Sequence, residues 1–301
     1  MMQIKNALGQ KNVGKVSLNE PLHKHTTIKI GGPADIFIEP NSIESIKTTV
    51  AILRESQIPI RVIGRGSNLL ISDEGIRGAV IKFGKGMDHL VENGNRITVG
   101  GGYPLVGLST IMSKKGRDGL AFAGGIPGSV GGAVYMNAGA HGSDIGKILV
   151  KAHILFPDGT TKWLTNKEMR FSYRKSILQE EPRGYCVEAV FHLNEGNKEE
   201  IRKKMKRYKA YRKETQPWDL PCCGSVFRNP LPHHAGALVE QLGLKGKKIG
   251  GAKISELHGN FIVNDNNATF KDVMELINYI KESVKTTYNI ILETEVEIIK
   301  N

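Results

Sequence analysis

Hydrophobic and polar residues alternate with two different periods along the chain, which predicts a mixture of strands and helices. A period of two follows a Gly-Gly-Pro turn and predicts a strand within residues 28–40. Apolar residues three and four positions apart predict a helix over residues 42–56, with Ser42 as its N-cap. Similar patterns predict further strands over 60–63, 69–71, 79–83, 96–99, 150–156, 161–164, 185–193, 261–263 and 290–299, and further helices over 104–115, 199–215, 235–242 and 271–288. Strands and helices do not alternate strictly, so the pattern favours an α+β fold over a doubly wound parallel sheet.

Length and composition indicate a globular protein of two domains. The chain has 301 residues, and its character changes near residue 195, where we place the domain boundary. No apolar run is long enough to span a bilayer, and residues 1–16 lack the apolar stretch of a secretory signal. Cys186, Cys222 and Cys223 form neither a paired framework nor a Cys/His metal motif. We therefore expect a cytoplasmic protein with no metal site and no membrane insertion.

Positive charge is concentrated in one predicted helix. The chain has 42 basic and 30 acidic residues, a net charge of +12, and the densest basic run is RKKMKRYKAYRK at 202–213. Acidic residues at the start of the helix and basic residues at its end suit the helix dipole, so a solvated amphipathic helix explains the run. The alternative is attraction of an anionic substrate. No nucleic-acid-binding signature accompanies it, so we expect no nucleic-acid partner.

The most informative segment is GGIPGSVGGAVYMNAGA at residues 124–140. Six of its residues are glycine, so its backbone is accessible to a flat or charged ligand. Ser129 lies in PGSVGG, which lacks the glycine that a G-x-S-x-G nucleophile motif requires, so a serine hydrolase is not indicated. The alternative is a cluster of structural turns.

A second glycine-rich segment, GRGSNLL at residues 64–70, follows a predicted strand. Successive N–H groups in such a turn form an anion-binding nest, and Ser67 and Asn68 add side-chain donors. It matches neither the dinucleotide-binding fingerprint nor the P-loop. A tight turn between strands is the alternative. Two such segments in one chain favour a large cofactor that carries phosphates.

Three other segments carry side chains suited to catalysis. Arg174, in FSYRKS, could bind a carboxylate or phosphate, although it could also be a surface arginine. Ser225, in PCCGSVFRNP, could donate a proton to a carbanion, or could be a turn serine bonded to its own backbone. Glu293, Glu295 and Glu297 share one face of the predicted final strand, either as a solvated row or against a ligand.

Taken in order, seven segments resemble the MurB family of UDP-N-acetylenolpyruvoylglucosamine reductases. They are IKIGGPADIF, GRGSNLL, GGIPGSVGGAVYMNAGA, FSYRKS, CGSVFRNP, ELHGNFIVN and LETEVEII, and they extend from about Thr26 to Ile299. Each motif alone is modest, whereas seven in this order are specific. The chain contains no inserted substrate-capping loop, so it is similar to the shorter, second type of the family.

The resemblance implies an FAD-binding domain of the vanillyl-alcohol-oxidase (PCMH) type, in two subdomains, over residues 30–196. An N-terminal segment, 1–29, would pack on it, and a smaller α+β substrate domain, 197–301, would follow. FAD would bind non-covalently, with its pyrophosphate at residues 64–70 and its flavin and ribityl chain along 124–140. The residues expected at FAD are Gly64, Arg65, Gly66, Ser67, Asn68, Leu69, Gly124, Gly125, Ile126, Ser129, Gly131, Gly132, Ala133 and Asn137.

The resemblance also implies a reaction in two halves. NADPH, a co-substrate, reduces FAD, and flavin N5 then delivers a hydride to C3 of UDP-N-acetylglucosamine enolpyruvate. Ser225 would protonate C2, and Arg174 and Glu295 would flank the substrate carboxylate, where positive charge stabilises the developing oxyanion. The product would be UDP-N-acetylmuramate, a peptidoglycan precursor. Arg212, Gln216 and Arg228 are candidates for the substrate diphosphate.

Some positions depart from the family pattern, and two other functions compete with it. His141 stands where tyrosine is common, Thr294 where proline is common, and Cys222 and Cys223 where one small or polar residue is usual. Because Cys223 adjoins the expected proton donor, we expect sensitivity to thiol reagents. One competing function is an oxidase on the same fold, which would turn over with oxygen. The other is an anion- or nucleic-acid-binding protein, which would bind no flavin.

Overall fold

The computed structural model describes residues 1–300, which fold into two compact units. Unit 1 contains residues 1–20, 35–65 and 78–210, and unit 2 contains residues 21–34, 66–77 and 211–301. The chain therefore passes between the units several times. The expected boundary near residue 195 follows the sequence order, whereas the spatial division assigns two early segments, 21–34 and 66–77, to the unit that carries the C-terminal part.

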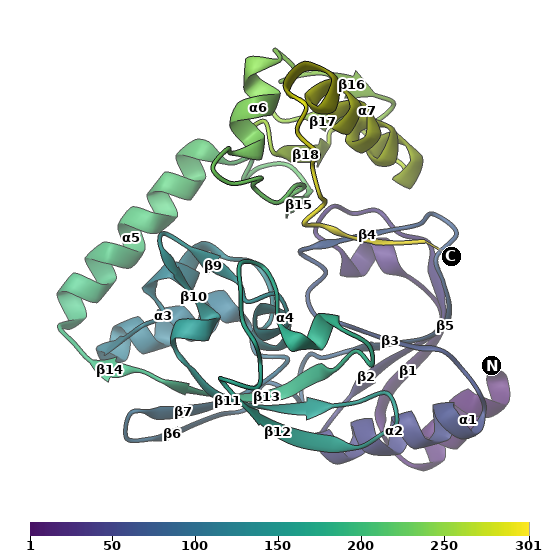
Figure 1. The fold of residues 1–301 in the computed structure, drawn as a ribbon. Coiled ribbons are helices and arrows are strands. Elements are labelled where there is room, and N and C mark those ends of the chain that lie inside the picture. The colour runs from purple at the N-terminus through teal and green to yellow at the C-terminus, as the bar shows by residue number, and fades with distance from the viewer. Residues whose placement is uncertain (301) are drawn as a thin grey trace. The chain divides into compact units, whose positions relative to one another are not determined.

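A four-stranded sheet with the order β1–β2–β5–β3 forms one half of unit 1 (Figure 1). Helices α1 and α2 lie side by side against it, and Leu8, Ile46 and Leu53 on these helices are fully buried. Helix α2 begins as predicted, because the Ser42 hydroxyl accepts a hydrogen bond from the Ser45 N–H at 3.0 Å. The elements are α1 (Met2–Gln10), β1 (Gly14–Pro21), β2 (Pro33–Pro40), α2 (Ile43–Glu55), β3 (Ile60–Ile63) and β5 (Ile76–Lys82).

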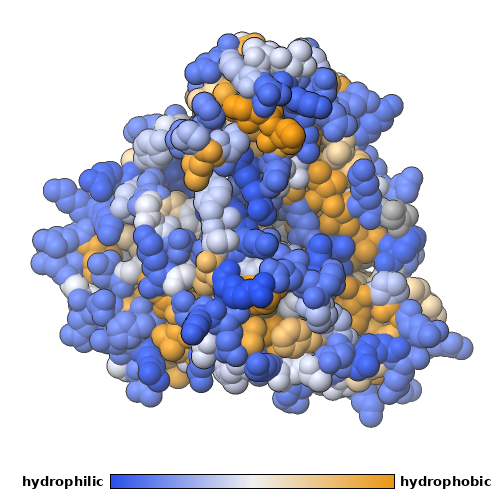
Figure 2. All heavy atoms as spheres, in the orientation of Figure 1, coloured by the Kyte–Doolittle hydropathy of each residue, from blue (hydrophilic) through white to orange (hydrophobic). Residues whose placement is uncertain are grey.

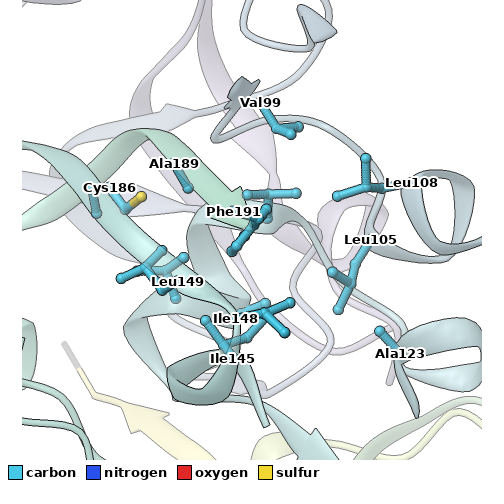
Figure 3. Packing of buried hydrophobic residues seen from close by; sticks show 14 of the residues in the cluster. Val99, Leu105, Leu108, Ala123, Ile145, Ile148, Leu149, Cys186, Ala189 and Phe191 are labelled. Atoms are coloured by element: carbon cyan, nitrogen blue, oxygen red, sulfur yellow. The ribbon is translucent and has the colours of Figure 1, made fainter. Parts of the chain in front are cut away.

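A five-stranded antiparallel sheet with the order β12–β11–β13–β7–β6 forms the other half of unit 1. Figure 3 shows Val99 and Phe191 of this sheet packed with Leu105 and Leu108 of α3. Gly116 ends α3 in the left-handed conformation. The main elements are β6 (Leu90–Asn93), β7 (Arg96–Gly100), α3 (Leu105–Lys115), α4 (Val130–Tyr135), β11 (Leu149–Leu155), β12 (Thr161–Thr165) and β13 (Tyr185–His192).

Short elements connect these parts of unit 1. They are β8 (Arg117–Asp118), which pairs with β14 (Asn194–Glu195), β9 (Gly139–Ala140), which pairs with β10 (Ser143–Asp144), and the 3-10 turns η2 (Ala121–Gly125), η3 (Ile145–Lys147) and η4 (Ile177–Gln179). Helix α5 (Lys198–Thr215) begins in unit 1 and ends in unit 2. Its buried residues are Ile201 and Met205, and most of its basic residues are exposed, which agrees with the amphipathic-helix interpretation.

Unit 2 is built on a four-stranded sheet with the order β15–β18–β17–β16. Helix α7 covers one hydrophobic core, and a capping box between Thr269 and Asp272 begins it. Asn289 ends α7 in the left-handed conformation. The elements are η1 (Leu22–His25), β4 (Leu69–Ile71), β15 (Cys222–Ser225), α6 (Ala235–Gln241), β16 (Lys248–Ile249), β17 (Ala252–Ile254), β18 (Phe261–Asn264), α7 (Phe270–Tyr288) and β19 (Glu297–Ile299).

The C-terminal segment corrects one prediction. A single strand was expected over residues 290–299, but only β19 is a strand, parallel to β4, and a bend precedes it at residues 295–296. The segment bonds first to residues 226–228 and then to β4, so it changes direction between two partners. The three glutamates therefore do not form one face of a continuous strand.

Hydrophilic side chains predominate on the face of the protein shown in Figure 2, and apolar residues lie there in separate groups. Large apolar side chains such as Ile291 and Leu231 are exposed singly, at 75% and 69%. Single exposed apolar residues are ordinary on a protein surface.

Candidate active site

The two glycine-rich segments meet inside unit 1. A Cβ atom added to Gly64 would collide with the Ser129 hydroxyl, so the end of β3 lies directly against the start of α4. Ser129 is 2% exposed and is the N-cap of α4, where its hydroxyl accepts the Gly132 N–H at 3.4 Å. Two segments that are 65 residues apart therefore form one surface of backbone with few side chains.

Close backbone contacts explain why the segment 124–140 is rich in glycine. Gly131 donates its N–H to the Gly101 carbonyl at 2.8 Å, and a Cβ on Gly131 would lie 2.6 Å from the Cys186 carbonyl oxygen. A Cβ on Gly124 would lie 2.6 Å from Met205 of α5. Other residues expected at FAD lie along the same stretch: Gly125 ends η2, Ile126 packs on the core, and Gly132 and Ala133 are in α4.

Arg174 is presented by a tight turn that is attached to the same glycine-rich segment. Ser172 and Lys175 exchange two backbone hydrogen bonds of 3.1 Å, and Arg174 between them has a φ of +56°. A positive φ is unfavourable for a residue with a side chain, so other contacts must hold it. The guanidinium donates to the Gly139 carbonyl at 2.8 Å.

Two amide side chains hold this turn in place. Gln179 donates to the carbonyls of Arg174 and Tyr135, at 3.1 and 3.0 Å. Asn137, expected at FAD, donates to the Ser172 carbonyl at 2.9 Å and accepts the Gly146 N–H at 2.8 Å. Both polar atoms of the Asn137 side chain are thus hydrogen-bonded to the backbone of the protein. Gln179 could not be identified from the sequence, because a single glutamine forms no motif or periodic pattern.

Ser225 and Glu295 lie next to each other in unit 2. The carbonyl of Val226, the residue after Ser225, accepts the Glu295 N–H at 2.8 Å. Phe227 forms a β-bridge with Thr294, and the Arg228 N–H donates to the Glu293 carbonyl at 3.0 Å. Backbone hydrogen bonds therefore bring together two segments, 70 positions apart, whose residues are expected to act on one substrate.

The second half of the segment 64–70 belongs to this part of unit 2. The Asn68 side chain donates to the Glu295 carbonyl at 3.0 Å, and the Asn68 carbonyl accepts the Glu297 N–H at 3.0 Å. A Cβ on Gly224 would lie 3.7 Å from the Ser67 carbonyl, and Leu69 begins β4. Thus Gly64 and Arg65 belong to unit 1, whereas residues 66–69 lie beside Ser225 and Glu295.

The three candidates for substrate binding are all in unit 2. Arg212 is near the end of α5, Gln216 follows α5, and Arg228 follows Phe227; all three are partly buried. The Arg212 charge acts on the nearby Cys222, whose thiol pKa it lowers against a larger increase caused by burial. Arg212 therefore lies close to the strand that carries Ser225.

The structure argues against the expectation that Cys223 makes the protein sensitive to thiol reagents. Cys223 is 1% exposed, and burial raises the pKa of its thiol to about 12. A buried, protonated thiol is a poor nucleophile. His141, the other departure from the family pattern, stacks on Tyr208 of α5, with ring centroids 3.9 Å apart and an interplanar angle of 3°.

Neither a metal cluster nor a membrane-spanning helix is present among residues 1–300. No group of three or more His, Cys, Asp or Glu side chains in this range could hold a metal ion. In the same range, no helix combines the length and the apolar character that crossing a bilayer requires.

Comparison with known proteins identifies the family. The pattern described as "FAD binding domain" matches residues 34–165, and "UDP-N-acetylenolpyruvoylglucosamine reductase, C-terminal domain" matches residues 216–299. UDP-N-acetylenolpyruvoylglucosamine reductases from Bacillus velezensis and Bacillus subtilis are 60% and 58% identical over 299 residues, which is 99% of this chain and 99% of each relative. The crystal structure of the MurB enzyme from Thermus caldophilus is 36% identical, with a TM-score of 0.81 over 95% of this chain and 98% of that chain.

These matches cover both the segment that contains the glycine-rich motifs and the segment that contains Ser225 and Glu295. They confirm the α+β fold with a PCMH-type FAD-binding domain, and they confirm FAD as the cofactor. The chain belongs to the UDP-N-acetylenolpyruvoylglucosamine reductase (MurB) family of FAD-dependent oxidoreductases.

Proposed function

We propose that the protein reduces UDP-N-acetylglucosamine enolpyruvate to UDP-N-acetylmuramate in the cytoplasm, with NADPH as the reductant. The full-length similarity to reductases of this name supports the substrate class. The observation that carries the proposal within the chain is the hydrogen bond between the Glu295 N–H and the Val226 carbonyl. It brings the proposed proton donor, Ser225, beside a carboxyl group that can contact the same substrate.

The residues present in unit 1 fit FAD. A Cβ at Gly64, Gly124 or Gly131 would meet atoms of the chain itself, so these glycines let other parts of the chain pack closely against the two glycine-rich segments. Backbone with few side chains also allows close approach of a flat or phosphorylated ligand. Within unit 1, we expect Gly64, Arg65 and residues 124–133 to hold the cofactor. Bound FAD would supply the hydride chemistry, taking a hydride from NADPH and passing it from N5 to C3 of the enolpyruvyl group.

Ser225 would protonate C2 of the substrate, where negative charge develops. Its hydroxyl has no hydrogen bond to another side chain or backbone group among residues 1–300, so it can be directed toward a ligand. Gly224, with a φ of +77°, allows the strand to bulge immediately before Ser225, and a bulge changes the direction in which a side chain points. General acid catalysis of this kind is worth roughly 100- to 10,000-fold in rate.

Arg174 and Glu295 would act on the substrate carboxylate. A guanidinium pairs with a carboxylate through two parallel hydrogen bonds and stabilises an oxyanion that forms beside it. The positive φ of Arg174 and the bonds that hold its turn preorganise this side chain before substrate binds. Backbone hydrogen bonds between residues 226–228 and 293–295 hold Glu295 in position.

The test is anaerobic spectroscopy of the two half-reactions in wild-type protein and in Ser225→Ala. The wild-type flavin absorbance should bleach with NADPH and return when the enolpyruvyl substrate is added. In Ser225→Ala the bleaching should keep its rate, and the return should slow by roughly 100-fold or more. Ser283→Ala, a substitution on the exposed side of α7, is the control and should behave as wild type.

Other outcomes would redirect the proposal. Equal slowing of both halves in Ser225→Ala would remove the proton-donor role. A wild-type flavin that returns only with oxygen would identify an oxidase on the same fold, and failure to retain FAD would contradict the cofactor site.

A further inference from the structure

We propose that Asn260 is a positioning residue that fixes the proton donor Ser225 relative to Glu295. The proposal rests on the roles given to these two residues under the proposed function. Asn260 is a buried amide, 4% exposed, immediately before strand β18. It lies in the segment ELHGNFIVN, to which the sequence analysis assigned no catalytic or binding role.

The Asn260 side chain forms a closed pair of hydrogen bonds with one residue of the active-site strand. Its Oδ1 accepts the Phe227 N–H at 2.8 Å, and its Nδ2 donates to the Phe227 carbonyl at 2.8 Å. The Asn260 main-chain carbonyl accepts the N–H of the preceding residue, Val226, at 2.9 Å. The amide thus acts as one further residue of the β-ladder, although it is a side chain.

The same strand is held on its opposite edge by the segment that contains Glu295. The Val226 carbonyl accepts the N–H groups of Glu295 and Val296, at 2.8 and 3.3 Å, and Phe227 bridges to Thr294. Residues 226 and 227 therefore lie between Asn260 and the Glu295 segment. Loss of the amide would free one edge of the segment that joins Ser225 to Glu295.

A bulge immediately before Ser225 explains why this additional bond is needed. Strand β15 pairs Cys222 with Val263 and Ser225 with Phe261, so three steps on β15 match two steps on β18. The extra residue disrupts the regular ladder and leaves the strand free to twist. The pair of bonds from Asn260 restores a fixed register two residues beyond Ser225.

Proton transfer requires accurate placement of the donor, so the register of this strand should affect the rate of the reaction. A displacement of about 1 Å at a reacting group can lower the rate about 100-fold, even when the change is remote from the chemistry. Asn260 should therefore affect the half-reaction that uses Ser225, and not the reduction of the flavin by NADPH.

The chain offers a matched control on the same strand. Asn264 is also buried in part and also makes two hydrogen bonds to backbone, donating to the Ile28 carbonyl at 3.0 Å and accepting the Ala268 N–H at 2.8 Å. Neither partner belongs to the segments that carry Ser225 or Glu295. Asn264→Ala should therefore lower thermal stability in a similar way without a selective effect on either half-reaction.

The first experiment compares Asn260→Ala and Asn264→Ala, loaded with FAD, by anaerobic stopped-flow absorbance. For Asn260→Ala we expect flavin reduction within about twofold of wild type and substrate-driven reoxidation slowed by roughly 10- to 100-fold. Equal effects of the two substitutions on reoxidation, or an unchanged rate in Asn260→Ala, would overturn the positioning role. If the wild-type flavin is not reoxidised by substrate, the proposed function itself has failed, and that result is separate from any difference between the variants.

A second variant, Asn260→Asp, keeps the size of the side chain and is suited to a case in which Asn260→Ala does not fold. A protonated aspartic acid has one donor and one acceptor and can replace both hydrogen bonds to Phe227, whereas the carboxylate lacks the donor. The reoxidation rate of Asn260→Asp, divided by the wild-type rate at each pH, should rise as the pH falls from 9 to 6. Division by the wild-type rate removes the titration of the surrounding groups His258, Glu240, Lys245 and Glu295. A ratio that does not change with pH would contradict the proposal.

Discussion

The glycine-rich region of unit 1 and the Ser225–Glu295 region of unit 2 are built in opposite ways. In unit 1, Gly64 and Gly131 matter because they lack a side chain, and the atoms around them leave no room for one. In unit 2, a polar side chain, Asn260, supplies hydrogen bonds that the backbone alone does not complete. The first region should therefore be sensitive to the addition of a single methyl group, and the second to the removal of a single polar group.

The largest expected effect is that of Gly131→Ala. The new Cβ would lie 2.6 Å from the backbone oxygen of Cys186, which cannot move without shifting β13. Such overpacking typically costs about 1–3 kcal/mol, so the free energy of unfolding should fall by this amount and FAD retention should fall with it. Thermal unfolding and the ratio of flavin to protein absorbance measure the two effects.

Gly132→Ala is the control for the effect on the free energy of unfolding only, because Gly132 is itself expected at FAD. Gly132 is exposed, and its Cβ would lie 3.5 Å from the Ser129 hydroxyl, an ordinary contact. Alanine is also favoured over glycine inside a helix by up to about 1 kcal/mol, so α4 should keep or gain stability. If Gly131→Ala and Gly132→Ala lower the free energy of unfolding equally, lack of space does not explain why residue 131 is glycine.

An intermediate effect is expected from Gln179→Ala. The substitution removes two hydrogen bonds, to the carbonyls of Arg174 and Tyr135, and releases the positive φ of Arg174. We expect a loss of about 1 kcal/mol in substrate binding, which is a roughly fivefold higher KM for the enolpyruvyl substrate, with flavin reduction by NADPH unchanged. Steady-state kinetics test this, with Gln10→Ala on the exposed side of α1 as the control. An unchanged KM would show that the turn keeps its shape without Gln179. A buried amide side chain would then be needed for activity only in the Ser225–Glu295 region, where Asn260 lies.

A smaller effect, on stability alone, is expected from Asp272→Asn in the capping box of α7. The backbone N–H groups of Thr269 and Gly251 lower the pKa of Asp272 below its ordinary 3.8. A lowered folded-state pKa means that the stabilisation is complete above about pH 4 and is lost as the pH falls through the folded-state pKa. The carboxylate is largely solvated, so we expect a loss of about 0.5–1 kcal/mol at pH 7 that shrinks below pH 4.

Chemical denaturation at pH 7 and pH 3 measures this difference for wild type and Asp272→Asn. The half-reactions at pH 7 should not change, because α7 supports the core of unit 2 without contacting residues 225–228 through Asp272. If this substitution slowed reoxidation as Asn260→Ala is expected to, stability would explain both, and the contrast between the two regions would be lost.

No effect on turnover is expected from treatment with iodoacetamide for a short time at pH 7–8. Burial raises the thiol pKa of Cys223 to about 12 and that of Cys186 to about 12, and the half-buried Cys222 also has a raised pKa. Mass spectrometry should find Cys223 unmodified in the folded protein and modified after unfolding. Rapid modification of Cys223 in the folded state would show that the Ser225 strand opens in solution.

Much of the fold follows from local rules that a sequence contains. Ser42 begins α2 and Gly116 ends α3 because an N-cap hydroxyl and a left-handed glycine act on neighbouring residues. The order of seven motifs also identified the family and its FAD, because each motif keeps its residue types in sequence. The predicted strand over residues 290–299 was wrong because its bend depends on two distant partners, Val226 and Asn68.

The sequence by itself thus determined the elements, the family and the candidate residues Arg174, Ser225 and Glu295. Only the tertiary structure decided that Gly64 lies against Ser129, that Glu295 bonds to Val226, and that Gln179 and Asn260 hold the two active-site segments. The physical reason is the range of the interactions. Caps, turns and periodicity act within a few residues, whereas these contacts join residues that are between 5 and 69 positions apart along the chain and leave no periodic trace in it.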